Sequence, residues 1–378
     1  MSDHNLRHRL FQMSIAYRST DPECPRTATF EEAIQAPIPS PGHLWVPSSL
    51  PTVTFPAKDE PFTRFLDIVM KTFAPNVWTA DMLESFNSID MVVEEKRFNG
   101  RPVHELQLWH GKTQAFKDFG CEVAAILYQK LLTNKRVLVA TSGDTGASVA
   151  QSFAARKGLR ATVLYPSGKI SAYQERQITR CDDPHHRILP VAVPGDFDRC
   201  QLIAKELLMR YPDQLVSANS ISLARLLPQI AYHAWVGAQF KEPCTVVVPS
   251  GNMGNACAAI MGMRMGANID HVHIACNEND SVARYLNGKD EAFRAKPTVN
   301  TPATAMDIGK PSNWVRLQYL GVGPGCDDVS ASATKSEHIR PIRHELNVCP
   351  HTAIAYHALK ACPVLMRAKN VVVIATAS

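Results

Sequence analysis

The sequence lacks the features of membrane, disulfide-rich and nucleic-acid-binding proteins. No apolar run approaches the roughly 18 residues that a membrane span needs, and residues 1–20 lack the apolar core of a signal peptide. The ten cysteines form no C-x-x-C pair, which is typical of a protein from a reducing compartment. The net charge is only +5, and no basic run with interleaved aromatics is present. We therefore expect a cytoplasmic protein with neither a membrane nor a nucleic acid as partner.

Metal-binding and dinucleotide-binding motifs are also missing. The histidine pairs His185–His186 and His271–His273 have no third ligand at metal-site spacing, so we interpret them as ordinary histidines and expect no metal. Neither GxGxxG nor GxxxxGK[ST] occurs. Their absence argues against an NAD-dependent oxidoreductase and against a P-loop enzyme.

What the chain does contain is a regular alternation of strands and helices. Residues 1–60 are rich in proline and turn residues and predict an irregular extension packed on the rest of the protein. From about residue 62, short β-branched runs alternate with amphipathic stretches, which predicts an α/β fold of two doubly wound domains with parallel or mostly parallel sheets. The expected strands are Arg136–Ala140, Ala161–Tyr165, Ile188–Val193, Thr245–Val248, Val272–Cys276 and Asn370–Thr376, and helices should follow Asp118, Gly146, Asp198, Ser222 and Asn255.

The first candidate motif is LWHGKTQAFKDFG, residues 108–120, followed by an apolar-periodic helix. Lys117 stands at the start of that helix, where other nearby positive charge disfavours the ammonium form and favours a nucleophilic amine. The alternative interpretation is that Lys117 and Asp118 form an ordinary surface cap.

Three further loops carry clustered donors. In TSGDTG, residues 141–146, hydroxyls and N–H groups precede a helix and suit a carboxylate, although a capped turn has the same pattern. In SGNMGN, residues 250–255, two glycines and two asparagines predict a bowl of N–H donors for a phosphate rather than a plain turn. In SANSISLAR, residues 217–225, Asn219, Ser220 and Arg225 can clamp a second anion, unless Ser222 is a simple cap and Arg225 lies on the surface.

These four segments, in this order, resemble the threonine synthase family. HGKTQAFKDFG is similar to the family's HGPTxAFKDFG box, TSGDTG to its carboxylate loop, and SGNMGN to its cofactor-phosphate loop. The resemblance continues through residues 165–177, 194–201, 277–286, 305–317, 350–359 and 371–377, so it covers nearly the whole chain. It implies a pyridoxal 5'-phosphate (PLP) enzyme of fold type II.

The resemblance also implies residue roles. Lys117 would carry PLP as a Schiff base and then move protons. Asp144 would lie near the cofactor's phenolic oxygen, and Thr376 would face its ring nitrogen. The cofactor phosphate would be held by Gly251, Asn252, Met253, Gly254 and Asn255. The substrate carboxylate would be held by Thr141, Ser142 and Thr145, and the substrate phosphate by Asn219, Ser220 and Arg225.

The implied reaction converts the small molecule O-phospho-L-homoserine and water into L-threonine and phosphate, in a monomer or homodimer. The implied domains are an N-terminal extension at 1–95, a large cofactor domain at 96–120 and 236–378, and a small substrate domain at 121–235. Two alternatives stay open: a PLP-dependent phospho-lyase acting on phosphothreonine or phosphohomoserine, and a non-catalytic metabolite-binding relative.

The sequence departs from the family pattern in places. Lys112 stands where the family usually has proline, which places an extra cation near the expected Schiff base. Cys349 replaces an acidic residue before PHTA. The sequence ends at Ser378, whereas the family pattern continues with an HPxKF-like segment.

Overall fold

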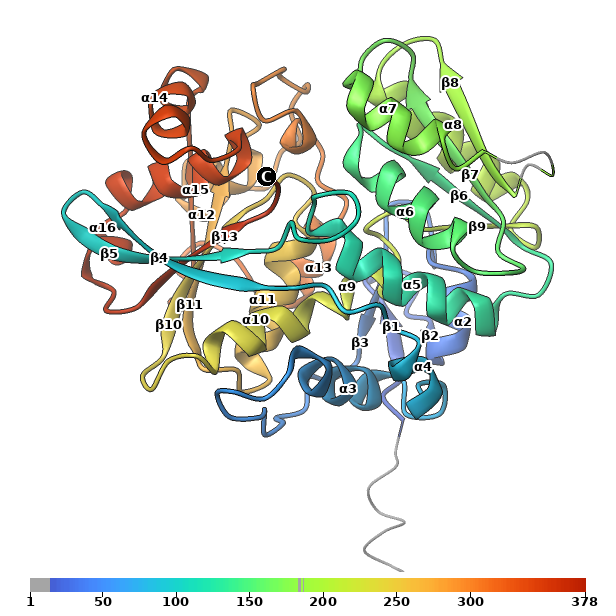
Figure 1. Ribbon diagram of the computed structural model, residues 1–378, viewed down its shortest axis with the longest axis horizontal. Coiled ribbons are helices and arrows are strands. Elements are labelled where there is room, and N and C mark those ends of the chain that lie inside the picture. Colours follow the sequence, from blue (N-terminus) through green and yellow to red (C-terminus); the bar gives the residue numbers. More distant parts are fainter. Residues whose placement is uncertain (1–13, 183–184, 186) are drawn as a thin grey trace, which may run out of the picture.

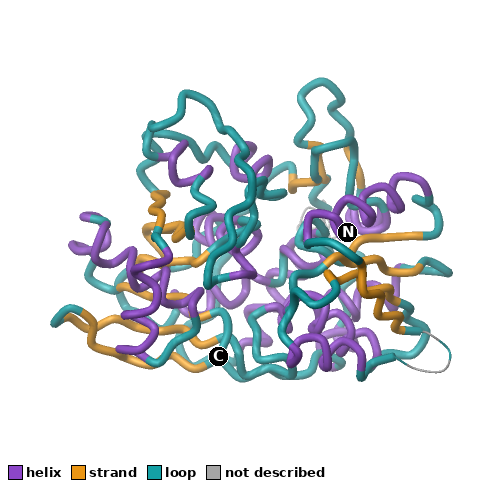
Figure 2. Tube along the Cα trace, turned by 90° about the horizontal axis from the view of Figure 1, so that it is seen from above, coloured by secondary structure: helices purple, strands orange, loops and turns teal. Residues whose placement is uncertain are grey.

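The computed structural model describes residues 14–378 apart from 183, 184 and 186. The described chain forms two α/β halves, each with its own sheet, and the C-terminal end lies between them (Figure 1). Seen from above, the strands form two groups with helices around each (Figure 2). This arrangement confirms the predicted fold class of two mostly parallel α/β units.

The larger sheet has six strands in the order β12-β11-β10-β13-β5-β4. Their bounds are β4 Val92–Phe98, β5 Arg101–Gln107, β10 Cys244–Pro249, β11 Ile269–Cys276, β12 Val329–Ala333 and β13 Val371–Ala375. The central strands β10 and β13 are buried along their whole length, as expected for valine-rich parallel strands covered on both faces. β4 pairs antiparallel at the edge, where its sequence VVEEKRF carries charge that discourages further pairing.

The smaller sheet has four parallel strands in the order β8-β7-β6-β9. They are β6 Arg136–Ala140, β7 Ala161–Pro166, β8 Ile188–Val193 and β9 Leu215–Ser217. Alternate residues of β6 face opposite layers: Leu138 packs with Cys200 of helix α8 (Phe197–Arg210), while Val139 belongs to the main core with Ala147 of helix α6 (Asp144–Ala154). The sheet is therefore covered on both faces.

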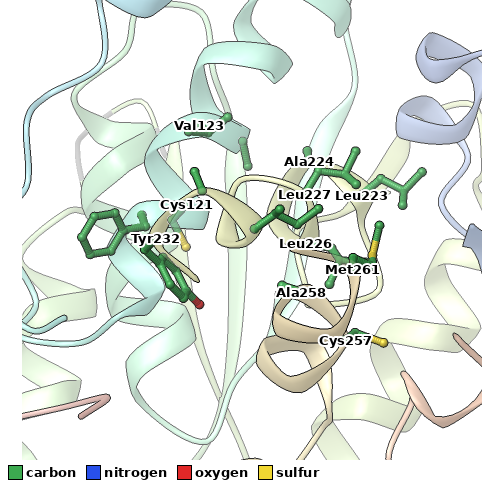
Figure 3. Close-up of a cluster of buried hydrophobic side chains, with 14 of the residues drawn as sticks. Cys121, Val123, Leu223, Ala224, Leu226, Leu227, Tyr232, Cys257, Ala258 and Met261 are labelled. Carbon is green, nitrogen blue, oxygen red and sulfur yellow. The ribbon is translucent and has the colours of Figure 1, made fainter. Parts of the chain in front are cut away.

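Four helices build the core beneath the space between the sheets. They are α5 (Lys117–Leu131), α9 (Leu223–Leu226), α10 (Gln229–Gly237) and α11 (Gly254–Arg264). Figure 3 shows their apolar side chains packed together, with Cys121 from α5, Leu226 from α9 and Met261 from α11. Helices α5, α9 and α11 begin in or just after three of the four predicted motifs, so this core holds those motifs in place.

The N-terminal segment is more regular than predicted. β1 (Tyr17–Ser19), β2 (Thr27–Ala28) and β3 (Trp45–Pro47) form an antiparallel sheet, and helix α2 (Phe30–Gln35) lies between β2 and β3. Helices α3 (Phe62–Phe73) and α4 (Ala80–Glu84) come after residue 60. The prediction of an irregular stretch was wrong here because strands of two or three residues are too short to show periodicity. The start of α2 did have a signal, since Thr29 and Glu32 form a capping box.

The remaining elements are α7 (Ala172–Thr179), α12 (Ser281–Leu286), η1 (Thr304–Met306), α13 (Trp314–Tyr319), α14 (Ser336–Leu346), α15 (Pro350–Ala361) and α16 (Pro363–Arg367). The six predicted strands are present within a few residues, but β4, β5, β9 and β12 were not predicted. All strands of the smaller sheet fall within 121–235, whereas α10 belongs mostly to that segment and packs on α11 and α3. The domain limits therefore stay a prediction.

The described structure also bears on the histidine pairs and on possible membrane-spanning helices. His271 and His273 on β11 hydrogen-bond to Ser330 and Ser332 on β12, at 2.7–2.8 Å, while His186 lies outside the described residues. Within the described chain, no three His, Cys, Asp or Glu side chains are grouped as metal ligands would be. Nor does a helix in that part combine the length and apolar character of a membrane span.

Candidate active site

One cavity collects every site residue predicted from the sequence. It lies where the first turns of α5, α6 and α11 meet the loop before α9 and the end of β13. Its lining includes Lys117, Thr141, Ser142, Asp144, Thr145, Asn219, Ser220, Arg225, Gly251, Asn252, Met253, Gly254, Asn255 and Thr376. Segments more than 250 residues apart in sequence thus form one site, although the individual roles stay predictions.

Lys117 is the first residue of α5, and its amine points into this cavity. Its Nζ lies 3.0 Å from Oδ2 of Asp144 and 4.6 Å from the ring centre of Phe116. The N–H of Phe116 donates to the carbonyl of Thr376 at 2.9 Å, which ties the start of α5 to the end of β13. The amine is therefore held by three elements, with a carboxylate beside it.

The pair Lys117–Asp118 is not a surface cap. The Asp118 side chain is buried and accepts hydrogen bonds from the N–H and hydroxyl of Thr113, at 2.8 and 2.6 Å, which closes the loop before α5. Lys112 is exposed and lines a neighbouring hollow rather than the main cavity. Lys112 is therefore not among the residues that line the cavity with Lys117.

Asp144 is the first residue of α6 and stays ionised. Its Oδ1 accepts from Nε2 of Gln174 at 2.7 Å, and its Oδ2 accepts from Lys117. Burial opposes ionisation, but the charges of Lys117 and His351, with the two hydrogen bonds, lower the pKa of this carboxyl to about 2. Gly143 makes room for Gln174: its φ is +139°, and a Cβ there would lie 2.3 Å from the Gln174 amide.

In the loop at residues 141–146, some hydrogen-bond donors are used within the fold. The hydroxyl of Thr141 donates to the carbonyl of Gly143 and accepts from the N–H groups of Gly143 and Gly146. The N–H of Thr141 donates to the carbonyl of Leu164. Thr141 therefore uses its hydroxyl within the turn and its N–H toward β7. The role of Thr141, Ser142 and Thr145 as carboxylate ligands stays a prediction.

The loop at 251–255 offers donors that nothing else uses. In the part of the chain that the structure describes, the N–H groups of these five residues donate no hydrogen bond. Met253 adopts the left-handed conformation at φ 62°, just before α11 begins at Gly254. Buried donors are normally paired, and unpaired N–H groups at a helix start favour an anion. This bowl fits a phosphate group.

Asn255 adds a side-chain donor to the same loop. Its Oδ1 accepts from the hydroxyl of Tyr232 and from Nε2 of His233, both at 2.8 Å. Its Nδ2 is buried and has no partner among the described residues. Burial lowers the pKa of His233 to about 4, so this imidazole is neutral at pH 7 and donates from Nε2.

In the predicted second anion site, Asn219 is also bonded to the backbone of a neighbouring strand. Both amide atoms of Asn219 bond to the backbone of Ala140, at 3.2 and 2.7 Å, and its N–H donates to Ser217. These bonds use the backbone N–H of Asn219 and one of the two N–H groups of its Nδ2, so one side-chain donor is left. Asn219, Ser220 and Arg225 all line the cavity, and their role as phosphate ligands stays a prediction.

Arg225 is buried, with 3 % of its surface exposed. The alternative of a surface arginine is therefore wrong, although Ser222 does cap α9 by accepting from the N–H of Ala224. The Arg225 guanidinium donates to the carbonyl of Ala218 at 2.7 Å, and its Nε has no partner in the described chain. Gly120 permits this packing, since a Cβ there would lie 2.7 Å from the carbonyl oxygen of Arg225.

Sequence reasoning assigned no role to several residues that support the site. Arg316 is buried and donates to the carbonyls of Trp45, Ser220 and Ile221, and to Oδ1 of Asn313 at 2.6 Å. Burial lowers the pKa of Arg316 to about 10, which leaves it charged at pH 7. Asn313 donates to the carbonyl of Asn252 at 2.9 Å, so this pair joins the two anion loops.

Comparisons with known proteins agree with this geometry. Residues 96–377 match the model of the pyridoxal-phosphate dependent enzyme family. The chain is 32 % identical over 358 residues to threonine synthase of Buchnera aphidicola subsp. Acyrthosiphon pisum, covering 88 % of this chain and 82 % of that protein. With threonine synthase of Escherichia coli it is 36 % identical over 272 residues, covering 68 % and 62 %. The crystal structure of the Escherichia coli enzyme matches with a TM-score of 0.81 at 28 % identity, over 96 % of this chain and 88 % of that one.

The chain therefore belongs to the pyridoxal-phosphate dependent enzymes, in the threonine synthase group. Its cofactor is PLP, which is also bound in the solved threonine synthase of Brucella melitensis. The residues present fit this cofactor: the unpaired donors at 251–255 suit its phosphate, and the lysine amine in the same cavity suits its aldehyde.

Proposed function

We propose that this chain converts O-phospho-L-homoserine and water into L-threonine and phosphate. The observation that carries the proposal is that one cavity holds two separate groups of unpaired donors beside a lysine amine. One group is the loop 251–255 with Asn255 Nδ2. The other is the Ser220 hydroxyl, which only accepts hydrogen bonds among the described residues, together with the Arg225 guanidinium, which gives Nη1 to the carbonyl of Ala218. A cofactor phosphate accounts for one group, so the second calls for an anionic group on the substrate.

The charge of the cavity supports the same conclusion. Its charged lining residues are Lys117, Lys205 and Arg225, against the single carboxylate of Asp144. Since Asp144 is paired with Lys117, the lining leaves an excess of positive charge. A substrate with a dianionic phosphate complements this excess, and the fork of Arg225 suits phosphate oxygens.

When bound, PLP supplies an electron sink for negative charge that develops at the substrate's Cα. Lys117 would hold the cofactor at its aldehyde carbon and take the proton from Cα. Asp144 would orient the lysine amine, and Thr376 would offer a neutral hydroxyl to the ring nitrogen. Ser142 and Thr145 would hold the carboxylate, while Ser220 and Arg225 would hold the phosphate that leaves from Cγ. Water adds at Cβ.

We also propose that the protein acts in the cytoplasm as a monomer or homodimer. The state of its cysteines supports this location, because all ten are free thiols, and structural disulfides are rare in reducing compartments.

Borohydride reduction tests the role of Lys117. Reduction of the purified holoprotein followed by peptide mapping should place the pyridoxyl group on Lys117. The matched control is Lys112→Ala, which changes an exposed lysine five residues away and should leave labelling intact, whereas Lys117→Ala should abolish it. A label on a different lysine of the wild type would refute the assignment.

Product analysis tests the reaction. Incubation of the holoenzyme with O-phospho-L-homoserine should yield threonine and phosphate in equal amounts. Release of 2-oxobutyrate with phosphate would instead identify a phospho-lyase, and absence of turnover with full PLP occupancy would indicate a non-catalytic relative.

A further inference from the structure

His351 enters the cavity from a part of the chain that the proposed reaction does not yet use. It is the second residue of α15, and the cavity lining includes it. Its Nε2 is buried and has no hydrogen-bond partner among the described residues. A buried polar atom without a partner is costly and calls for an explanation. The cavity supplies one, since a ligand there would complete the hydrogen bonding of this nitrogen.

The opposite edge of the imidazole is already placed. Nδ1 lies 3.7 Å from Sγ of Cys349, the residue that precedes α15. His351 lines the same cavity as Lys117 and Asp144, and its charge helps to lower the pKa of the Asp144 carboxyl. Because Nδ1 lies against Cys349, Nε2 is the nitrogen left for a ligand.

The four charged residues named above, Lys117, Asp144, Lys205 and Arg225, are poorly suited to give up a proton during phosphate release. Lys205 is an exposed residue of α8, whereas Nε2 of His351 is buried. Asp144 is ionised at neutral pH and has none to give. Arginine is not deprotonated in proteins, so Arg225 binds an anion without transferring a proton. Lys117 is occupied at Cα. Histidine is the side chain whose ordinary titration range lies nearest neutral pH, which suits both gain and loss of a proton.

We infer that His351 carries the proton that links phosphate departure to water addition; this inference rests on the proposed function. Nε2 donates its proton to the ester oxygen as the bond between that oxygen and Cγ breaks, and phosphate leaves as the hydrogen phosphate dianion. In the same sequence Lys117 would move one proton from Cβ to Cγ, so that Cβ loses a hydrogen and Cγ becomes a methyl group. Water then adds its hydroxyl to Cβ and returns its proton to Nε2, and Lys117 would return the proton to Cα. One water is consumed, no electron is transferred to an outside acceptor, and His351 ends in its starting state.

Two assays separate this role from cofactor binding. Exchange of the Cα hydrogen of L-2-aminobutyrate in D2O reports on Lys117 and PLP alone, because this analogue has no leaving group. Phosphate release from O-phospho-L-homoserine reports on the later steps. For His351→Gln, we expect exchange within about threefold of wild type and a fall in phosphate release of about 100-fold or more, the usual size of a general acid–base contribution.

The control and the rescue use the same protein. His357→Gln changes another half-buried histidine of α15, which bonds to Thr334 and does not line the cavity, so both assays should stay near wild type. In His351→Ala, added imidazole should restore phosphate release at least tenfold, which a purely structural role would not allow.

The outcomes are distinguishable from failure of the proposed function. If wild type releases no phosphate, the proposed function fails, and this inference fails with it. If wild type turns over and His351→Gln releases phosphate at the wild-type rate, only the inference is overturned. Equal losses in both assays, without rescue by imidazole, would also overturn it and show that His351 acts on the cofactor site as a whole.

Discussion

Gly251 is the position where a single methyl group should disturb cofactor binding most. A Cβ built at Gly251 would lie 2.6 Å from Cα of Met306 and 3.0 Å from its carbonyl oxygen. Both are backbone atoms, which cannot rotate away as a side chain can. Gly251→Ala must therefore push apart the phosphate loop and the segment at η1, which together form one wall of the cavity.

The size of the effect follows from that distance. The Cβ is about 0.8 Å closer than the 3.4 Å at which ordinary contact begins. Inserting a methylene-sized group into tight packing costs about 1–3 kcal/mol. If the strain is relieved by opening the loop, PLP affinity should fall about 5- to 150-fold, since 1.4 kcal/mol corresponds to tenfold.

Titration of apoprotein with PLP, followed by absorbance, measures this loss. The matched control is Gly262→Ala on α11, where a Cβ would meet its nearest atom at 3.4 Å, away from the cavity lining. We expect the control to keep PLP affinity within about twofold. A folded Gly251→Ala variant with wild-type affinity would contradict the argument, because the loop would then not need the close approach to Met306.

Two further predictions concern charge. Arg225→Ala should weaken phosphohomoserine binding about tenfold or more while PLP binding changes little, since a charged hydrogen bond is worth about 1.5–3 kcal/mol. Arg225→Lys should restore the affinity only in part. Substrate titration of the PLP spectrum measures both variants, and wild-type affinity in Arg225→Ala would contradict the prediction. Burial lowers the pKa of His233 to about 4 and of His273 to about 3, so the unfolded chain binds more protons than the native one below about pH 6.5. The free energy of unfolding should therefore fall as pH drops from 6.5 toward 4, by up to about 1.4 kcal/mol per pH unit for each histidine. Urea unfolding at several pH values gives the free energy of unfolding as a function of pH. The slope of this free energy against pH should be shallower for His273→Gln than for the exposed control His344→Gln. Equal slopes would rule out the contribution of His273.

The four motifs and the strand–helix alternation were readable from the sequence because they are local. A β-branched run followed by a glycine- or hydroxyl-rich turn and an amphipathic helix predicts its own structure, as at β6 and α6 or β10 and α11. Parallel pairing then brings the carboxyl ends of such strands to one edge of a sheet. That local logic predicted the turns, whereas the resemblance to the threonine synthase family implied that Lys117 and the loop 251–255 share one site.

The tertiary structure decided how each donor is used. Thr141 and Asn219 line the cavity as the sequence predicted, but the hydroxyl of Thr141 also closes a turn, and the Asn219 amide also bonds to the backbone of Ala140. Arg225 had two interpretations until its burial against Gly120 excluded the surface one. Whether a polar side chain is satisfied by its own fold depends on neighbours that periodicity does not reveal.

Residues far apart in the chain complete the site for the same reason. Arg316 reaches the carbonyl of Trp45 across 271 positions, and His351 enters the cavity from α15. Both lie in segments that resemble the family, but nothing local marks Arg316 as bonding to Ser220 or His351 as lining the cavity. The sequence by itself determined which turns carry donors and where the amine lies. Only the packing of separate helices on two sheets decided which of those donors remain unpaired for a ligand, because hydrogen bonds within the fold and hydrogen bonds to a ligand compete for the same atoms.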